Sequence, residues 1–397
     1  MERNRLYLAL ATLYSLYFLV YVHRTITGVL KPELTEVAGL YGLDAVFLTS
    51  SLASTYFYAY SAMQLPAGVL ADALGVRKYV SISAGIMSAG VFLFASARPQ
   101  LMLLGRLLIG AGAAAVYVSI QRVIGIYASQ DRGGLLTGLA LSIGNIGALF
   151  ATLPSRVVID ALGFSNFFVV LAVSSSLLTI APTHTIADEG LGSKGVVEGL
   201  KKTISQLKIA ATSYHSIAVA LAYTGTYSAV LAFQSYWAYE YLQKNFGMSK
   251  EEVAQALLLL ALAFLATVPL VGYTSDSILK KRKPILVAGC FLHSAAWFTA
   301  ILLPATSSRA AVNAYMLVLG LVASTHMVIS PMAREAYPPE FSGTTFAFVN
   351  MVGFLAVAVY QSLGLVVKDP VHILALFSVA SLVSGLLALR AKETMNS

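Results

Sequence analysis

Four residues near the start of the chain have the types and the spacing for binding chemistry. Tyr14, Tyr17, Tyr21 and Arg24 are separated by three, four and three residues, which places them on one face of a helix. A guanidinium binds a carboxylate or a phosphate through paired hydrogen bonds. The stretch predicts recognition of an anionic group, with Tyr17, Tyr21 and Arg24 as substrate-binding residues. The alternative is that Arg24 extends outward along the helix to lipid headgroups.

His23 precedes Arg24 and is a candidate proton-binding group. Imidazole titrates near neutral pH, so this side chain could take up and release a proton. The other interpretation is a hydrogen-bonded packing residue.

The composition places these residues in a membrane. Hydrophobic residues make up 58% of the 397 residues and charged residues 11%, whereas an average soluble domain has about 45–50% and about 25%. The net charge of +8 comes from basic residues scattered at the ends of apolar segments, which does not favour nucleic-acid binding. The one cysteine, Cys290, excludes an intrachain disulfide and suggests no metal site.

Twelve apolar segments are long enough to span a bilayer, which needs about 20 residues each. They are expected at 6–30, 45–71, 78–97, 100–127, 133–159, 164–182, 213–242, 250–274, 284–304, 310–336, 342–366 and 370–389. The predicted fold is an all-α membrane protein with six helices in 1–183, a polar linker at 184–212 and six helices in 213–397. The linker carries Asp188, Glu189 and Lys194, and its segment VVEGLKKTISQL could form a surface helix.

The distribution of basic residues predicts the orientation. Most of the 26 Lys and Arg residues fall on the side that holds both termini and the linker. The positive-inside rule therefore places both termini in the cytoplasm. The basic and then apolar N-terminus is read as a retained first helix rather than a cleaved signal peptide.

A short charged sequence occurs twice. GVLADALGVRK at 68–78 returns as GYTSDSILKKR at 272–282, with Asp72 matching Asp276 and Arg77 matching Lys281. This repeat predicts two copies of one unit. Gly75 permits a tight turn, but Leu279 stands at the matching place in the second copy. Asp72 could pair with Arg77 or cap a helix, or the loop could be a solvated turn.

The first copy resembles the signature loop of the major facilitator superfamily, between the second and third segments. The resemblance implies two six-helix halves that work by alternating access in the cytoplasmic membrane. It also implies a monomer. The loop then acts as a conformational latch, which we assign to Gly68, Asp72, Gly75, Arg77, Lys78 and Asp276.

The fourth segment carries Arg106-Leu-Leu-Ile-Gly110-Ala-Gly112, which resembles the family's RxxxGxG motif. A cation in a hydrocarbon segment is costly and normally faces the protein interior or water. Arg106 could help proton transfer or could bridge backbone carbonyls.

The first segment also resembles that of organic-anion symporters within the superfamily. YVHRTITGVLKPEL carries the similarity, and Arg122 matches a second basic position of that group. His23 stands where an acid is usual, and Ala113 replaces a glutamate used in proton coupling. The resemblance implies an anionic or zwitterionic substrate and leaves the coupling mechanism open.

Further candidate residues lie in later segments. Tyr223, Tyr227 and Gln234 are spaced by four and seven residues and should share a face. Asn145 and Asn350 could bind substrate or hold helices together. The aromatic run 56–60, followed by Gln64, resembles the second helix of a prokaryotic branch of the superfamily that includes amino-acid transporters, although packing is the favoured interpretation. The remaining substrate-binding candidates are Trp237, Asn145, Asn350 and His326, which follows Arg122 by 204 residues.

The favoured function is proton-coupled symport of a small carboxylate-bearing solute, either an organic anion or an amino acid. The alternative is drug or metabolite efflux by proton antiport, although Gly138, Gly144, Gly147 and Pro154 do not fit the antiporter pattern GxxxGPxxGG. The sequence has no GxxxxGK[ST], HExxH or GxSxG motif, so neither ATP use nor enzyme activity is expected, and no cofactor is predicted.

Overall fold

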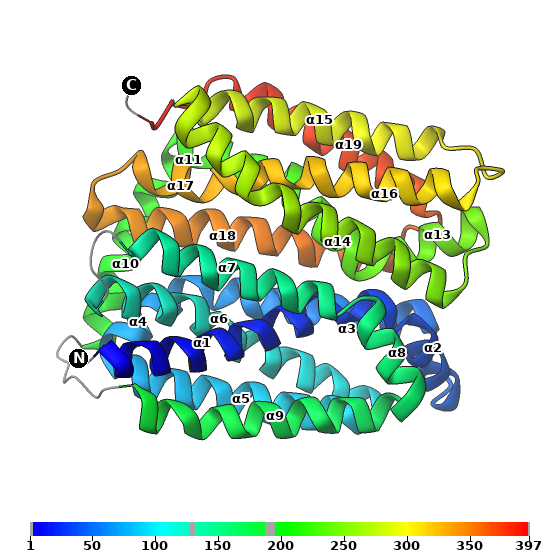
Figure 1. Ribbon diagram of the computed structural model, residues 1–397, viewed down its shortest axis with the longest axis horizontal. Helices are drawn as coiled ribbons and strands as arrows, with labels where there is room; N and C mark the ends of the chain where they lie inside the picture. The colour runs from blue at the N-terminus through cyan, green and yellow to red at the C-terminus, as the bar shows by residue number, and fades with distance from the viewer. Residues whose placement is uncertain (1–2, 128–131, 187–194, 396–397) are drawn as a thin grey trace. The chain divides into compact units, whose positions relative to one another are not determined.

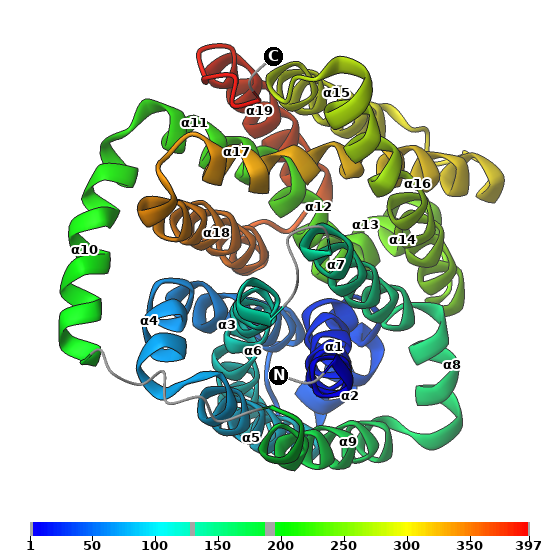
Figure 2. The ribbon, with the colours of Figure 1, turned by 60° about the vertical axis from the view of Figure 1, so that its left-hand side comes forward.

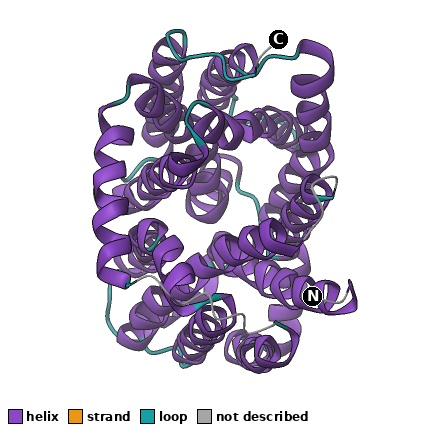
Figure 3. Ribbon diagram, turned by 90° about the vertical axis from the view of Figure 1, so that its left-hand side faces the viewer, coloured by secondary structure: helices purple, strands orange, loops and turns teal. Residues whose placement is uncertain are grey.

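The computed structural model describes residues 3–127, 132–186 and 195–395. Helices dominate these residues and no strand occurs among them (Figure 3). Contacts divide the chain into two compact units, Met1–Thr203 and Ile204–Ser397. Asp188, Glu189 and Lys194 of the predicted linker lie outside the described residues. The segment VVEGLKKTISQL, interpreted from its sequence as a possible surface helix, lies in the helix α10 (Val196–Thr212).

Unit 1 is a bundle of packed helices (Figure 1). Its helices are α1 (Arg3–Thr25), η1 (Ile26–Val29), α2 (Lys31–Leu40), α3 (Ala45–Ala62), α4 (Gln64–Leu74), α5 (Val76–Ala95), α6 (Pro99–Tyr127), α7 (Gly133–Phe150), α8 (Leu153–Leu162) and α9 (Phe164–Thr185).

Unit 2 contains more irregular helices, with α15 and α19 side by side (Figure 2). Its helices are α11 (Tyr214–Tyr223), η2 (Thr224–Ser228), α12 (Ala229–Ala232), η3 (Phe233–Trp237), α13 (Ala238–Phe246), α14 (Lys250–Tyr273), η4 (Thr274–Leu279), α15 (Lys283–Leu302), α16 (Arg309–Ala323), η5 (Ser324–Val328), α17 (Ile329–Glu335), α18 (Pro339–Ser362), η6 (Leu363–Leu365) and α19 (Pro370–Ala388). The segments η2, η3 and η4 are π-helical.

Eleven helical stretches among the described residues are long and apolar enough to cross a membrane. They correspond to eleven of the twelve predicted segments. The exception is the second segment, which is divided at Met63 into α3 and α4. Serine, threonine and tyrosine side chains also interrupt the apolar sequence of α3. The all-helical membrane fold is therefore confirmed, whereas the twelfth span and the side of the termini remain predictions.

Two details of the helices go beyond the predicted segments. The connection between the first two segments contains the ten-residue helix α2. The fifth segment was expected to be continuous over 133–159, but it breaks between α7 and α8. Pro154 lies in the first turn of α8, where its missing N–H is tolerated. A proline also disfavours the α-helical conformation at the residue before it, which explains why the helix does not continue from α7.

A close glycine contact joins the second and fourth segments of unit 1, and another joins the eighth and tenth segments of unit 2. A Cβ atom at Gly110 of α6 would collide with the carbonyl oxygen of Tyr56 in α3. A Cβ atom at Gly320 of α16 would collide in the same way with the carbonyl oxygen of Leu260 in α14. Small residues let membrane helices pack at short distances. This shared packing supports the interpretation that the chain contains two copies of one unit.

Arg156 joins three elements of unit 1 through a buried ion cluster. Its side chain is 1% exposed and forms paired hydrogen bonds with Glu33 of α2 (3.0 and 2.5 Å). It also binds Asp160 one helical turn later (3.1 and 2.8 Å) and the carbonyl oxygen of Val29 (3.0 Å). One cation therefore holds α8 against α2 and η1.

The C-terminal segment is fixed to unit 2 by polar contacts. The Lys392 amide donates to His215 Nδ1 (3.1 Å). The Glu393 carboxylate accepts hydrogen bonds from the backbone N–H groups of Arg282 (2.9 Å) and Lys283 (3.1 Å) at the start of α15. Partial burial alone would raise the pKa of Glu393, but these backbone donors, with those of Met395 and Thr394, hold that pKa below its usual value.

We predict that Arg156→Ala destabilises unit 1, because it leaves two carboxylates without their cation. Loss of one partner of a buried ion pair costs about 3–5 kcal/mol, and the partial exposure of Asp160 favours the lower value. We expect the melting temperature of the detergent-solubilised protein to fall by roughly 6–12 °C. Arg98→Ala, at an exposed position, is the control. Equal melting temperatures for the two variants would contradict the structural role.

We predict a pH-dependent effect of Glu393→Gln. Because the folded-state pKa of this carboxyl is lowered, its stabilisation is present above the unfolded-state pKa of about 4.3 and is lost as the pH falls through the folded-state value. The site is exposed, so solvent screening limits the effect at pH 7 to roughly 0.5 kcal/mol. The difference in melting temperature should shrink below about pH 4. Glu198→Gln on α10 is the matched control, and a difference independent of pH would refute the assignment.

Candidate binding site and charge networks

Arg24 lies near the end of α1 and is 2% exposed. Its guanidinium carbon lies 4.3 Å from the ring centroid of Tyr21 and 5.0 Å from that of Tyr60 in α3. This burial does not fit the alternative in which Arg24 extends to the headgroups. An aromatic face attracts a cation without neutralising it. The geometry therefore holds a positive charge within unit 1 among tyrosine side chains, and Arg24 also hydrogen-bonds with the side chains of Tyr56 and Tyr60.

The tyrosine face expected from the spacing continues along α1. The Tyr17 hydroxyl donates to the Tyr21 hydroxyl (3.3 Å), and the Tyr17 ring stacks on Tyr117 of α6 with centroids 5.5 Å apart. Tyr14 donates to the carbonyl oxygen of Leu136 (2.7 Å) in α7. These contacts fix the rings that surround Arg24.

Asn145 of α7 lies next to this face. The preceding residue, Gly144, packs so closely on the Tyr17 and Tyr21 rings that a Cβ atom would overlap them. Asn145 is half-buried. In unit 2, Gly353 of α18 packs on the Tyr223 ring in the same manner, three residues after the half-buried Asn350. Each asparagine therefore belongs to a helix that meets a tyrosine ring through a glycine, one residue before Asn145 and three residues after Asn350.

Arg106 joins α1 and α3 through backbone carbonyls. Its Nε donates to the Leu52 oxygen (2.8 Å) and its Nη1 to the His23 oxygen (2.7 Å). Its guanidinium carbon also lies 4.8 Å from the ring centroid of Tyr56. The structure thus displays the carbonyl-bridging role that was one of the two interpretations of this residue.

His23 is fully buried beside this bridge. Neither of its ring nitrogens has a hydrogen-bond partner among the described residues. The interpretation as a hydrogen-bonded packing residue therefore does not describe this structure. In a neutral imidazole one ring nitrogen is a donor and the other is an acceptor that can take up a proton.

The first signature loop is organised by an ion pair between helices. Asp72 of α4 pairs with Arg122 of α6. The sequence offered Arg77 or a helix end as partners of Asp72, and it offered substrate as the partner of Arg122. In this conformation Arg122 is instead engaged by the loop.

The other residues of the loop lie at or near the turn between α4 and α5. Gly75 ends α4 with φ of 76°, a conformation that favours glycine. Gly68 lies in α4, whereas Arg77 and Lys78 lie in the first turn of α5.

The second signature loop is shifted by one residue relative to the predicted alignment. Asp276 pairs with Arg282 (2.8 Å), and Arg282 also binds Glu335 (2.7 Å). The left-handed turn residue is Lys280 (φ 48°), not Leu279. The π-helical segment η4 explains the shift, because a π-helical turn holds one more residue than an α-helical turn. The match of Arg77 with Lys281 is therefore corrected to Arg282.

An aromatic cluster forms the corresponding part of unit 2. His326 of η5 stacks on Tyr227 with centroids 4.1 Å apart and on Phe264 of α14 at 5.5 Å. Tyr223 stacks on Tyr227 at 5.7 Å, so these two tyrosines share a face as predicted. The His326 Nδ1 lies 2.9 Å from the carbonyl oxygen of Ala323. Since a carbonyl only accepts, Nδ1 carries the proton and Nε2 of the neutral ring is an acceptor.

Gln234 and Trp237 lie in the π-helical segment η3 and are buried. Trp237 Nε1 donates to the carbonyl oxygen of Tyr360 (2.8 Å) in α18, which gives it a packing contact. Two π-helical segments interrupt this part of the chain, so the spacing from Tyr227 to Gln234 no longer reports a shared α-helical face.

Sequence reasoning missed three aromatic contacts of these clusters. Tyr60 was interpreted as packing, yet it faces Arg24. Tyr117 and Phe264 were not singled out, although they stack on Tyr17 and His326. The aromatic run at 56–60 was a usable signal for Tyr60. Nothing in the spacing of Tyr117 or Phe264 identifies their partners, because those contacts join distant segments.

Comparison with known proteins gives a consistent assignment. The sequence profile described as Major Facilitator Superfamily matches residues 13–390. A curated relative from Cupriavidus necator, named "Probable sulfoacetate transporter SauU", is 25% identical over 173 residues. That match covers 43% of this chain and 39% of the relative, so the chain spans well under two thirds of it.

Two solved structures share the fold. A D-xylose–proton symporter superposes with a TM-score of 0.76 at 15% identity, covering 98% of each chain. A POT family transporter in complex with 5-aminolevulinic acid superposes with a TM-score of 0.72 at 14% identity, covering 96% of this chain and 95% of that one. At these identities the similarity concerns the fold alone. With a family profile that matches nearly the whole sequence, the chain belongs to the major facilitator superfamily and is a membrane transport protein, not an enzyme.

Proposed function

We propose that this transporter carries a small carboxylate-bearing solute, an organic anion or an amino acid, across the cytoplasmic membrane by proton-coupled symport. The observation that carries the proposal is the Arg24 guanidinium, buried against the rings of Tyr21 and Tyr60. A guanidinium recognises a carboxylate through two parallel hydrogen bonds. Holding the cation on aromatic rings orients it before the ligand arrives.

The relatives support an anionic substrate. Sulfoacetate, in the name of the curated relative, carries a carboxylate and a sulfonate. The 5-aminolevulinic acid in one structural neighbour also carries a carboxylate. We infer that Tyr17 and Tyr21 complete the anion site on α1. The candidates Arg122, Asn145, Tyr223, Tyr227, Gln234, Trp237, Asn350 and His326 remain proposed contributors.

We propose His23 as the proton-binding group, with Arg106 as its neighbour. The imidazole is buried, its ring nitrogens have no partner among the described residues, and its own carbonyl is held by Arg106. A D-xylose–proton symporter among the structural neighbours shows that the fold accommodates proton coupling. The acid expected at this position in organic-anion symporters is absent here, so the proton would move on imidazole.

We retain the predicted architecture as part of this proposal. It comprises twelve spans, two six-helix halves in 1–183 and 213–397, cytoplasmic termini and a monomeric carrier. In this scheme the two charge networks, Asp72–Arg122 and Asp276–Arg282–Glu335, act as conformational latches that break and form again during alternating access.

We predict that Arg24→Ala abolishes stabilisation by a carboxylate ligand. Purified protein would be screened by thermal shift against amino acids, sugar acids, dicarboxylates and neutral sugars. Loss of charge-assisted hydrogen bonds worth about 1.5–3 kcal/mol should weaken the affinity by roughly 10- to 150-fold. Arg24→Lys keeps the charge but loses the paired geometry, and should be intermediate.

Arg98→Ala, which removes an exposed arginine of unit 1, controls for the change in net charge. Carboxylate stabilisation that persists in Arg24→Ala would contradict the assignment. So would stabilisation by uncharged or cationic compounds alone, which would favour the efflux alternative.

A further inference from the structure

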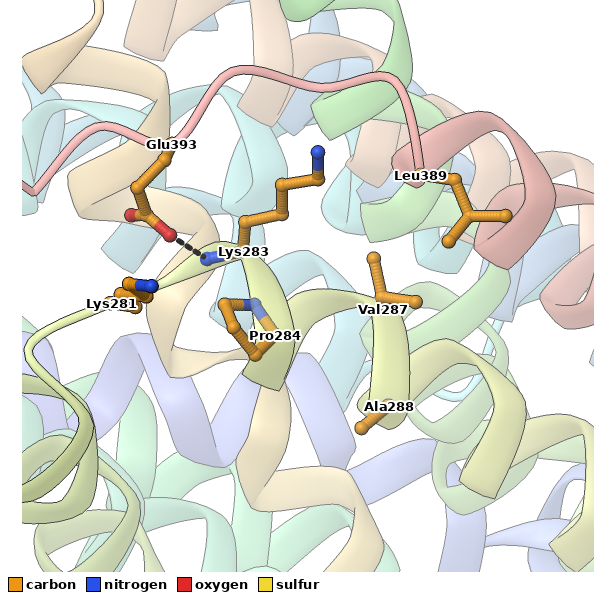
Figure 4. A pocket seen from close by; sticks show the side chains of 7 residues that line it. All are labelled: Lys281, Lys283, Pro284, Val287, Ala288, Leu389 and Glu393. Atoms are coloured by element: carbon orange, nitrogen blue, oxygen red, sulfur yellow. Dashed lines mark hydrogen bonds between the residues drawn. The ribbon is translucent and has the colours of Figure 1, made fainter.

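A pocket separate from the candidate substrate residues lies at the start of α15. Its volume is about 470 Å³, and it is lined by Lys281, Lys283, Pro284, Val287, Ala288, Leu389 and Glu393. The lining is segregated: Lys281, Lys283 and Glu393 lie at one end, and Val287, Ala288 and Leu389 lie at the other (Figure 4). A pocket with a basic end and an apolar end has the two-part chemistry of a phospholipid.

The basic end carries more positive charge than its own carboxylate can balance. Lys281 and Lys283 belong to four consecutive cationic residues, 280–283, and Arg390 and Lys392 follow on the C-terminal segment. Arg282 is engaged by Asp276 and Glu335. Glu393 is the one acidic residue in the lining of the pocket. The two lysines there provide a net attraction for an anion.

The apolar end of the pocket is exposed and lies on helices that could cross a membrane. Leu389 is 50% exposed, and Pro284 and Ala288 are exposed as well. These residues belong to α15 and to the end of α19, both of which carry apolar stretches long enough to cross a membrane. An acyl chain along Val287, Ala288 and Leu389 would therefore run beside apolar helix surface, with its headgroup at the lysines.

The C-terminal segment gives this pocket a fixed wall. Glu393 accepts from the backbone N–H groups of Arg282 and Lys283, and its dashed contact with Lys283 is visible in Figure 4. Lys392 is held by His215, and the Thr394 hydroxyl donates to Glu335 (2.9 Å). The segment that closes the pocket is thus anchored at three consecutive residues.

We propose that this pocket binds an anionic phospholipid, with the headgroup phosphate at Lys281 and Lys283 and an acyl chain along Val287, Ala288 and Leu389. Glu393 does not bind the lipid. It occupies the backbone donors at the start of α15 and so positions the C-terminal wall. Charge complementarity selects an anionic lipid over a zwitterionic one, and the apolar end selects a lipid over a soluble phosphate.

Native mass spectrometry of the full-length protein in detergent tests the proposal. The probes are phosphatidylglycerol, phosphatidylcholine with the same acyl chains, and the deacylated headgroup glycerophosphoglycerol. Phosphatidylglycerol should give a saturable adduct, whereas the other two probes should bind much more weakly. Each basic residue near an anionic lipid contributes about fivefold in affinity, so Lys281→Gln/Lys283→Gln should weaken the adduct about 25-fold.

Two further variants make the test specific. The control Lys244→Gln/Lys368→Gln removes the same charge and should leave lipid binding unchanged. These lysines lie at the end of unit 2 where α14 begins, which is opposite to the end where α15 begins. Leu389→Asn should weaken phosphatidylglycerol binding while the lysines remain. An equal loss in both lysine pairs, equal binding of both lipids, or headgroup binding as tight as lipid binding would each overturn the proposal.

Discussion

Placing arginine side chains inside apolar helices is the constraint on which this structure depends. A buried guanidinium is costly unless its charge and its donors are satisfied. Unit 1 meets this cost in three ways. Arg156 binds two carboxylates and a carbonyl, Arg106 binds two carbonyls, and Arg24 lies on two tyrosine rings. All three arrangements join helices. The partners of Arg24 are tyrosine side chains rather than carboxylates or carbonyl groups, and we propose that an anionic substrate binds there.

The internal repeat explains how two similar units carry different chemistry. Matching glycine contacts, at Gly110 with Tyr56 and at Gly320 with Leu260, keep the helix packing similar. The π-helical segment η4 of unit 2 shifts the register of the residues that follow it. This shift makes Arg282, rather than Lys281, the partner of Asp276. The π-helical segments η2 and η3 likewise remove the α-helical spacing that had related Gln234 to Tyr223 and Tyr227.

The sequence predicts the helical membrane fold well because hydropathy and span length are local properties. The stripe from Tyr14 to Arg24 is likewise local, and its ring contacts follow from helical spacing. Contacts between distant segments were less accessible: the pairing of Asp72 with Arg122 and the placing of Tyr60 on Arg24 depend on how helices pack. The breaks at Met63 and before α8 were missed because the apolar character continues across them. A hydropathy pattern does not reveal a π-helical segment, so the alignment of the two signature loops across η4 was wrong by one residue.

The central claim is that a carboxylate-bearing solute and protons move together. It is tested most directly in proteoliposomes by recording solute uptake and external pH at the same time under an imposed inward proton gradient, using a carboxylate that stabilises the purified protein. The account predicts accumulation of the solute above its equilibrium level, together with alkalinisation of the external medium. Expulsion of preloaded solute by the same gradient would contradict symport and would identify the protein as an exporter.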